Sequence, residues 1–306
     1  MTDSLWQAVR APLEPTHRLF FGYLLSALAI ALVLGVLRGR RTPAALFSWL
    51  FPRAIWAHPS TRTDAVFTVL QTLLEPLLSA VSVAWTTLIA VTLARGLEST
   101  LGAPGWLPWG PATAAALTVS LLAVTDFSHW LNHWVHHKVP FLWPLHAVHH
   151  SAPVLTPLTL YRRHPLYDVV KKVLEGSIVG GFQGGLVYLF AAPLDVWTLG
   201  GINVIYLGFL VAGANLRHTH VWWSWGWLDH VFVSPAQHQL HHSDDPAHEG
   251  NYGSIFAFWD TLAGTRIDAR MRPEDLRFGL YRGQPHSGVW DALVRPLSEM
   301  VRPPDD

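Results

Sequence analysis

The stretch DFSHWLNHWVHHKVPFLWPLHAVHHS, residues 126–151, decides the fold. It opens with His129, His133 and His137 at positions i, i+4 and i+8, which lie along one face of a helix. An HxxHH motif follows at His146, His149 and His150. Imidazole nitrogen is a good ligand for iron, zinc or copper, and helical pairs spaced by three or four residues converge on one metal. The stretch therefore predicts helices that bring histidines together around a metal.

The same spacing recurs toward the C-terminus. Residues 237–253, QHQLHHSDDPAHEGNYG, carry a second HxxHH at His238, His241 and His242, and an RHTH segment with His218 and His220 stands between the two blocks. One metal takes roughly four to six ligands, so these histidines suit two adjacent ions better than one. The chain has no cysteine, which excludes thiolate sites. No paired Glu-x-x-His elements occur, which argues against a ferritin-like carboxylate site.

The composition is that of a membrane protein. Half of the residues are hydrophobic, 14% are charged and there are 16 tryptophans, against roughly 25% charged residues in a soluble domain. Tryptophans of this abundance are typical of membrane interfaces. Lys+Arg and Asp+Glu are both 21, so no net basic charge favours binding to nucleic acid.

Five apolar segments are predicted to cross the membrane as helices: Leu19–Leu37, Ala65–Ala94, Ala112–Phe127, Val173–Ala192 and Val196–Leu216. The second is expected to be one tilted helix kinked at Pro76. A short outer turn at Pro193 and Asp195 is expected to join the last two. Arg38, Arg40 and Arg41 follow the first segment, and such cations gather on the cytoplasmic side. With five crossings, every histidine block lies on that side.

Two further expectations concern the membrane part. The first ten residues lack the basic start and the cleavage site of a secretory signal, so the first apolar segment is expected to be retained. A glycine-rich stretch is predicted to allow close contact between helices. Its residues are Gly180, Gly181, Gly184 and Gly185.

In their order along the chain, these motifs resemble the fatty acid hydroxylase/sterol desaturase superfamily of membrane oxidases, over about Ala112 to Asp268. The histidine motifs carry the resemblance together with several other short motifs. These are Asp126, Leu142–Trp143, Arg162–His164–Pro165, His218, Asn251–Tyr252–Gly253 and Trp259–Thr265.

The resemblance implies an all-α fold, namely a polytopic membrane helical bundle with a cytoplasmic helical cap that carries a histidine-rich dinuclear metal site. Residues 1–111 would form N-terminal membrane helices and connections, residues 112–268 the catalytic domain and residues 269–306 a C-terminal cytoplasmic tail. The implied metal ligands are His133, His137, His146, His149, His150, His218, His238, His241 and His242. Residues that could bind the metal or support its ligands are His129, His164, His220 and Asp126.

Aspartates are expected to accept the outer N–H of ligating histidines, and so to fix their tautomers. The candidates are Asp126, Asp229, Asp244, Asp245 and Asp260, with Asp126 preferred because it precedes His133 by seven residues. Other histidines are expected to be ordinary hydrogen-bonded residues. These are His17, His58, His136, His230 and His286.

The resemblance further implies a non-haem di-iron oxidoreductase with two iron ions per chain and O₂ as co-substrate. It would hydroxylate a C–H bond of a fatty acyl chain, a sterol or a lipid head group. Electrons would come from an external donor, either a cytochrome b5-like protein or a ferredoxin, since no flavin, haem or iron–sulfur motif is evident.

Three alternatives stay open. A lipid desaturase could use the same metal site. A histidine-rich membrane metal-binding or transport protein would instead need ionisable groups at mid-membrane depth, where Glu75 is the clearest one. A zinc hydrolase would need a general base such as the glutamate of HExxH, a motif that the sequence lacks.

Overall fold

The fold is helical, as the sequence predicts. The computed structural model describes residues 11–191, 196, 198–199, 202–281 and 283–301. Among these, the only strands are the two-residue β1 (Thr198–Leu199) and β2 (Ile202–Asn203), which pair antiparallel. Three helices of the described chain are long and apolar enough to cross a membrane. The prediction of a membrane helical bundle that carries a histidine cluster is confirmed.

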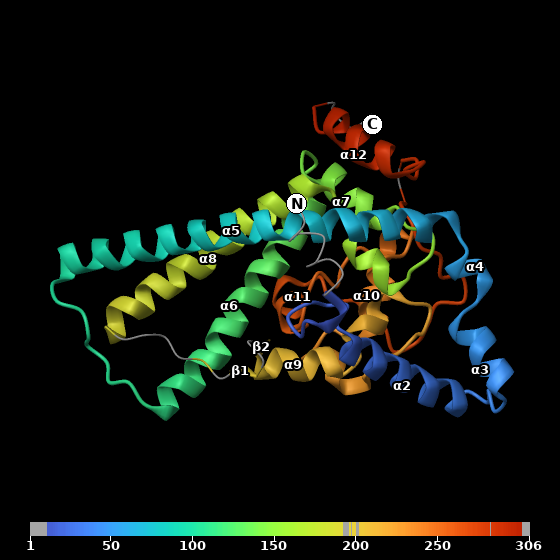
Figure 1. Ribbon diagram of the computed structural model, residues 1–306, viewed down its shortest axis with the longest axis horizontal. Helices are drawn as coiled ribbons and strands as arrows, with labels where there is room; N and C mark the ends of the chain where they lie inside the picture. The colour runs from blue at the N-terminus through green and yellow to red at the C-terminus, as the bar shows by residue number, and fades with distance from the viewer. Residues whose placement is uncertain (1–10, 192–195, 197, 200–201, 282, 302–306) are drawn as a thin grey trace.

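The three long helices are α5 (Pro59–Leu101), α6 (Pro111–Lys138) and α8 (Pro165–Phe190). Each has a proline in its first turn, where the missing N–H costs no hydrogen bond. α5 continues as one helix through Pro76. Figure 1 shows all three reaching away from a body that contains α7 (Trp143–His150) and α10 (Pro235–His241), the two helices with HxxHH motifs.

The remaining apolar segments differ from the prediction. α2 (Phe21–Leu37) has 17 residues, somewhat fewer than the roughly 20 of an average membrane crossing. Residues 196–216 do not form one helix. They are divided among the β1–β2 pair, the short α9 (Val204–Val211) and the 3-10 helix η3 (Ala214–His218). The described residues therefore contain three spans of full length in place of the five predicted.

Polar and glycine residues explain this division. The side chain of Asn203 accepts hydrogen bonds from the N–H groups of Ile205 and Tyr206, which starts α9 at that point. Gly213 has a φ of 87°, in the left-handed region that favours glycine, and it separates α9 from η3. The predicted turn at Pro193 and Asp195, and the first ten residues, lie outside the described residues.

Short elements complete the body around α7 and α10. Their bounds are η1 (Ala11–Leu13), α3 (Pro43–Leu50), α4 (Arg53–Trp56), η2 (Pro157–Tyr161), η4 (Gly226–His230), η5 (Pro246–His248), α11 (Phe258–Ala263) and α12 (Val289–Glu299). The segment expected to be a tail contains α12, which packs on α5 and α7. Ala292 of α12 is fully buried against Phe67 and Val148.

Glycines let α5 and α8 approach closely. A Cβ atom on Gly184 would lie 2.5 Å from the carbonyl oxygen of Ala90, and one on Gly180 would lie 2.6 Å from that of Thr86. Gly176 continues this face one turn earlier. Gly181 and Gly185 face open space. Close contact is thus confirmed for Gly180 and Gly184 of the four predicted glycines, and it is the packing expected where small residues line a membrane helix interface.

Replacing Gly184 with Val should destabilise the protein by about 1–3 kcal/mol, because the backbone of α5 must move away from the new side chain. Gly185→Val changes the same helix in the same way but places the side chain in open space. Thermal unfolding of the purified variants in detergent should show a clear loss for Gly184→Val only. Equal losses for both variants would contradict the close approach at Gly184.

Candidate metal centre

The nine histidines predicted as ligands lie in two groups. In each group the nitrogen atoms that could bind a metal all lie within 4.8 Å of one another. The first group contains His133, His137, His146, His150 and His241, and the second contains His149, His218, His238 and His242. The histidines come from the C-terminal part of α6, from α7, from η3, and from α10 with its C-cap residue. Figure 1 shows α7 and α10 in the body from which α6 reaches away.

The two HxxHH motifs contribute to the groups in a reciprocal way. From α7, His146 and His150 enter the first group and His149 enters the second. From α10, His238 and its C-cap residue His242 enter the second group and only His241 enters the first. On a helix, positions i and i+4 lie nearly above one another while i+3 lies to the side. Each motif can therefore serve two neighbouring sites at once.

Nitrogen atoms converge inside each group. In the second group the Nε2 atom of His218 lies 3.2 Å from Nε2 of His149 and 3.0 Å from Nε2 of His238. In the first group the Nε2 atoms of His146 and His150 are 3.2 Å apart. Several imidazoles that aim the same nitrogen at one point cannot all satisfy one another through hydrogen bonds.

Three Nε2 atoms of the first group, besides Nδ1 of His146, have no hydrogen-bond partner within the described chain. They are the buried Nε2 atoms of His133, His137 and His241. A buried polar atom without a partner costs about 1–3 kcal/mol. A metal ion at the centre of the group would satisfy all three at once, so the residues present fit a bound metal.

Backbone carbonyls fix two of these rings. Nδ1 of His133 donates to the carbonyl of Tyr252 at 2.8 Å, and Nδ1 of His241 donates to the carbonyl of Gly250 at 2.7 Å. Because a carbonyl can only accept, each Nδ1 carries the proton and each Nε2 keeps its lone pair for a metal. The carboxylate of Asp260 holds this loop by accepting from the N–H groups of Tyr252 and Gly253.

Arg162, from the Arg-x-His-Pro motif, holds α7 in place through a hydrogen bond to its backbone. Its side chain is 2% exposed, and its Nε donates to the carbonyl of Val148 at 3.0 Å. Its Nη1 lies 3.2 Å from Asp64 of α5, whose carboxylate is fully buried. Val148 stands between His146 and His149, so this network fixes the helix that supplies ligands to both groups.

The sequence predicts aspartates that accept hydrogen bonds from the ligating histidines, but in the described chain the five candidates bond to other groups. Asp126 accepts from the N–H groups of Ile255 and Phe256 at 2.8 and 2.9 Å, and from the indole of Trp259. It fastens α6 to the loop before α11, because its carboxylate faces that loop nearly two turns away from His133. In the described chain the other four candidates also bond to groups other than histidine rings. They are Asp229 with Ser224, Asp244 with Arg277, Asp245 with Ala247, and Asp260 with its loop.

Three further candidate histidines lie outside both groups. His129 forms an ion pair with Glu175 at 3.3 Å. His164 caps α8 and its Nε2 donates to the carbonyl of Leu293 at 3.1 Å. Nε2 of His220 donates to the carbonyl of Trp49 at 2.7 Å. Each therefore has a structural partner instead of a place among the convergent nitrogens.

Burial keeps the grouped histidines neutral. It lowers the pKa of His218 well below the ordinary value, and likewise that of His146, His149, His150, His238 and His242, for which neighbouring imidazoles are the next cause. For His218 the next cause is the positive charge of Arg18 and Arg217. Burial also lowers the pKa of His241 to about 3, although its bond to Gly250 opposes the shift. Neutral imidazole is the form that binds a metal.

Comparison with known proteins gives a consistent picture. Residues 118–265 match the family model described as fatty acid hydroxylase. An ornithine lipid hydroxylase of Rhizobium tropici is 32% identical over 183 residues, which are 59% of this chain and 46% of that protein. An alkylglycerol monooxygenase of Caenorhabditis elegans is 24% identical over 198 residues, 61% of this chain and 35% of that protein. The chain thus spans less than half of either relative. No solved structure matches significantly.

Proposed function

Because its histidine-rich region, residues 118–265, belongs to the fatty acid hydroxylase/sterol desaturase superfamily, we propose that the protein is a membrane-bound non-haem di-iron oxidoreductase. It uses O₂ to hydroxylate a C–H bond of a lipid. The observation that carries the proposal is the pair of adjacent histidine groups, each with nitrogens that converge on one point. Its catalytic domain is assigned to residues 112–268, with membrane helices and connections before it and a C-terminal segment after it.

The first histidine group would hold one iron ion and the second group the other. Bound ferrous iron supplies the reduction of O₂ and the oxidising power that an unactivated C–H bond requires. The chain positions its ligands through the carbonyls of Gly250 and Tyr252 and through Arg162 behind α7. Burial of the rings keeps water from the reacting centre. An external donor, such as a cytochrome b5-like protein or a ferredoxin, would provide the electrons.

A lipid substrate is supported by the membrane helices and by the relatives, whose names describe a lipid hydroxylase and an alkylglycerol monooxygenase. Those names favour insertion of oxygen over desaturation with the same metal site. A metal transporter is disfavoured because the histidine groups lie beyond the apolar stretches of α5 and α8, at one end of the molecule (Figure 1).

The metal site would face the cytoplasm. The cations at Arg38–Arg41 and at Lys171–Lys172 lie toward the end of the molecule that carries the histidines, and cytoplasmic segments are enriched in such cations. Reporter fusions after Gly105, in the loop between α5 and α6, and at the C-terminus should report opposite sides, with the C-terminus inside. Figure 1 shows that loop and α12 at opposite ends. A result that places both fusions on one side, or the C-terminus outside, would contradict this orientation.

Protein loaded anaerobically with ferrous iron should contain about two iron ions per chain. His241→Ala and His149→Ala each remove a ligand from a different group, so each should lower the content to about one. His230→Ala is the control, since His230 is exposed and bonded only to the carbonyl of Trp227. Elemental analysis by mass spectrometry measures the content. About one iron in the unaltered protein would refute the dinuclear site.

Growth of a host that expresses the gene under ¹⁸O₂ tests the reaction. A membrane lipid should gain one oxygen atom that carries the label, and the labelled lipid should be absent when the host expresses His149→Ala. Lipid mass spectrometry decides between the alternatives. A loss of two mass units without label would indicate a desaturase, and label that enters only from water would indicate a hydrolase.

A further inference from the structure

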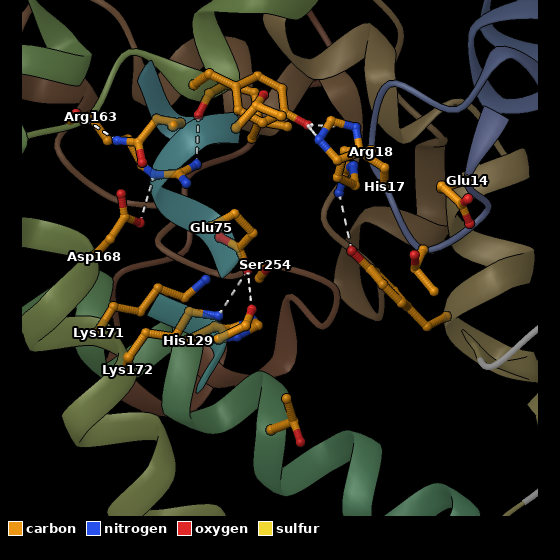
Figure 2. A pocket seen from close by; sticks show the side chains of 18 of the residues that line it. Glu14, His17, Arg18, Glu75, His129, Arg163, Asp168, Lys171, Lys172 and Ser254 are labelled. Carbon is orange, nitrogen blue, oxygen red and sulfur yellow. Dashed lines mark hydrogen bonds and ion pairs between the residues drawn. The ribbon is translucent and has the colours of Figure 1, made fainter. Parts of the chain in front are cut away.

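A polar pocket of about 670 Å³ lies between α5, α6, α8 and the residues that precede α2. Figure 2 shows His17 and Arg18 on one side, and Asp168, Lys171 and Lys172 on the other. Its lining contains side chains of both charges. Such charged side chains, beside apolar ones, favour a ligand that carries a polar part over a purely apolar chain.

The pocket lies next to the second histidine group. Nη2 of Arg18 donates to Oδ1 of Asn215 at 3.3 Å, and Asn215 precedes His218 by three residues in η3. No histidine of either group lines the pocket, but His129, which does, precedes His133 of the first group by about one turn of α6. The pocket therefore adjoins two elements, η3 and α6, that carry histidines of the metal centre.

Several charges of the lining are already paired, whereas Glu14, Arg18 and Lys171 are in none of the ion pairs found in the described chain. Arg163 pairs with Asp168 at 3.0 Å, and Lys172 pairs with Glu75 at 3.4 Å. Arg18 differs, because its partners in the described chain are the hydroxyl of Tyr206 and the amide oxygen of Asn215, both uncharged. Its Nε is buried and has no partner there. A guanidinium with free donors is suited to a carboxylate or phosphate group.

A free negative charge stands on the same side of the pocket. Glu14 is exposed and lines the pocket one turn before Arg18, and none of the ion pairs found in the described chain includes it. Figure 2 shows Glu14 and Arg18 on this one side. Arg18 and Glu14 thus offer a cation and an anion, on the same side of the pocket, to one ligand that carries an anionic group and a cationic group.

The depth of the pocket fits a lipid head group. Lys171, Lys172 and Glu75 lie where the polar beginning of α8 meets the middle of α5. Beyond them both helices become apolar. Charged side chains at such a boundary belong to the head-group layer of a bilayer. A lipid could thus place its polar head in the pocket while its chains remain in the membrane.

We propose that this pocket binds the polar head of a zwitterionic lipid substrate, with Arg18 contacting its anionic group and Glu14 its cationic group. Because the head then lies beside the second histidine group, the hydroxylated carbon belongs to the head group or to the chain atoms next to it. This proposal rests on the proposed function and specifies its substrate class.

Binding of short-chain lipids to the iron-loaded protein in amphipol tests the proposal without turnover. The zwitterionic probe is dihexanoyl-phosphatidylethanolamine, and the anionic probe is dihexanoyl-phosphatidylglycerol. Arg18→Gln should weaken the binding of both about tenfold, because both lose a charged hydrogen-bond donor. Glu14→Gln should weaken only the zwitterionic probe, because only that probe carries an ammonium group.

Two controls separate binding from folding. Arg277→Gln removes an exposed arginine that pairs with Asp244 elsewhere, and it should change neither affinity. Tyr206→Phe removes a hydrogen bond of Arg18 but keeps the guanidinium, so it should retain binding. The proposal is overturned if Tyr206→Phe weakens binding as much as Arg18→Gln, if Arg18→Gln changes nothing, or if Glu14→Gln affects both probes equally.

Iron content is measured on the same samples. If one of these overturning results is obtained while the unaltered protein holds about two iron ions, this inference fails and the proposed function stands. If the unaltered protein holds about one iron ion, the dinuclear proposal itself fails.

Discussion

The structure depends on one constraint: nine imidazole rings are packed together, seven of them buried and two half-buried, and each must stay neutral with a nitrogen aimed inward. Burial opposes the charged form of histidine, as the pKa of His241 shows. Neutrality alone does not orient a ring, because either nitrogen can carry the proton. The carbonyls of Gly250 and Tyr252 determine which nitrogen carries the proton in two rings of the first group, because each accepts a hydrogen bond from Nδ1. The loop that contains Gly250 and Tyr252 has no regular secondary structure, yet its conformation must place these two carbonyls beside the rings of His241 and His133.

Much of this arrangement is encoded locally and could be predicted. The spacing of His133 and His137, and of each HxxHH motif, follows from the periodicity of a helix, which any reader of the sequence can apply. The histidines that come together could likewise be predicted, since nearly all of them belong to such motifs. The long helices α5, α6 and α8 follow from continuous apolar stretches.

Features that depend on contacts between distant segments could not be predicted. The division of each HxxHH motif between two groups depends on how α7 and α10 face one another. Asp126 lies at a position that suggests support of a histidine, yet its carboxylate meets backbone N–H groups 129 and 130 residues away. Asn203 and Gly213 are ordinary residues in an apolar segment, and only the folded chain shows that they interrupt it. Backbone carbonyls orient two of the rings, and because every residue has one, the sequence does not show which carbonyls have this role.

Because α12 packs against α5 and α7, the folded domain extends beyond the residues that match the family model. The family match ends at residue 265, but Ala292 fills the space beside Val148 and Phe67. His164 adds a bond to the carbonyl of Leu293 in the same helix. A fragment cut at the limits of the match would lose this outer support of α7 and expose an apolar face beside the imidazoles. The matched part of the sequence thus relies on a helix that lies outside the match.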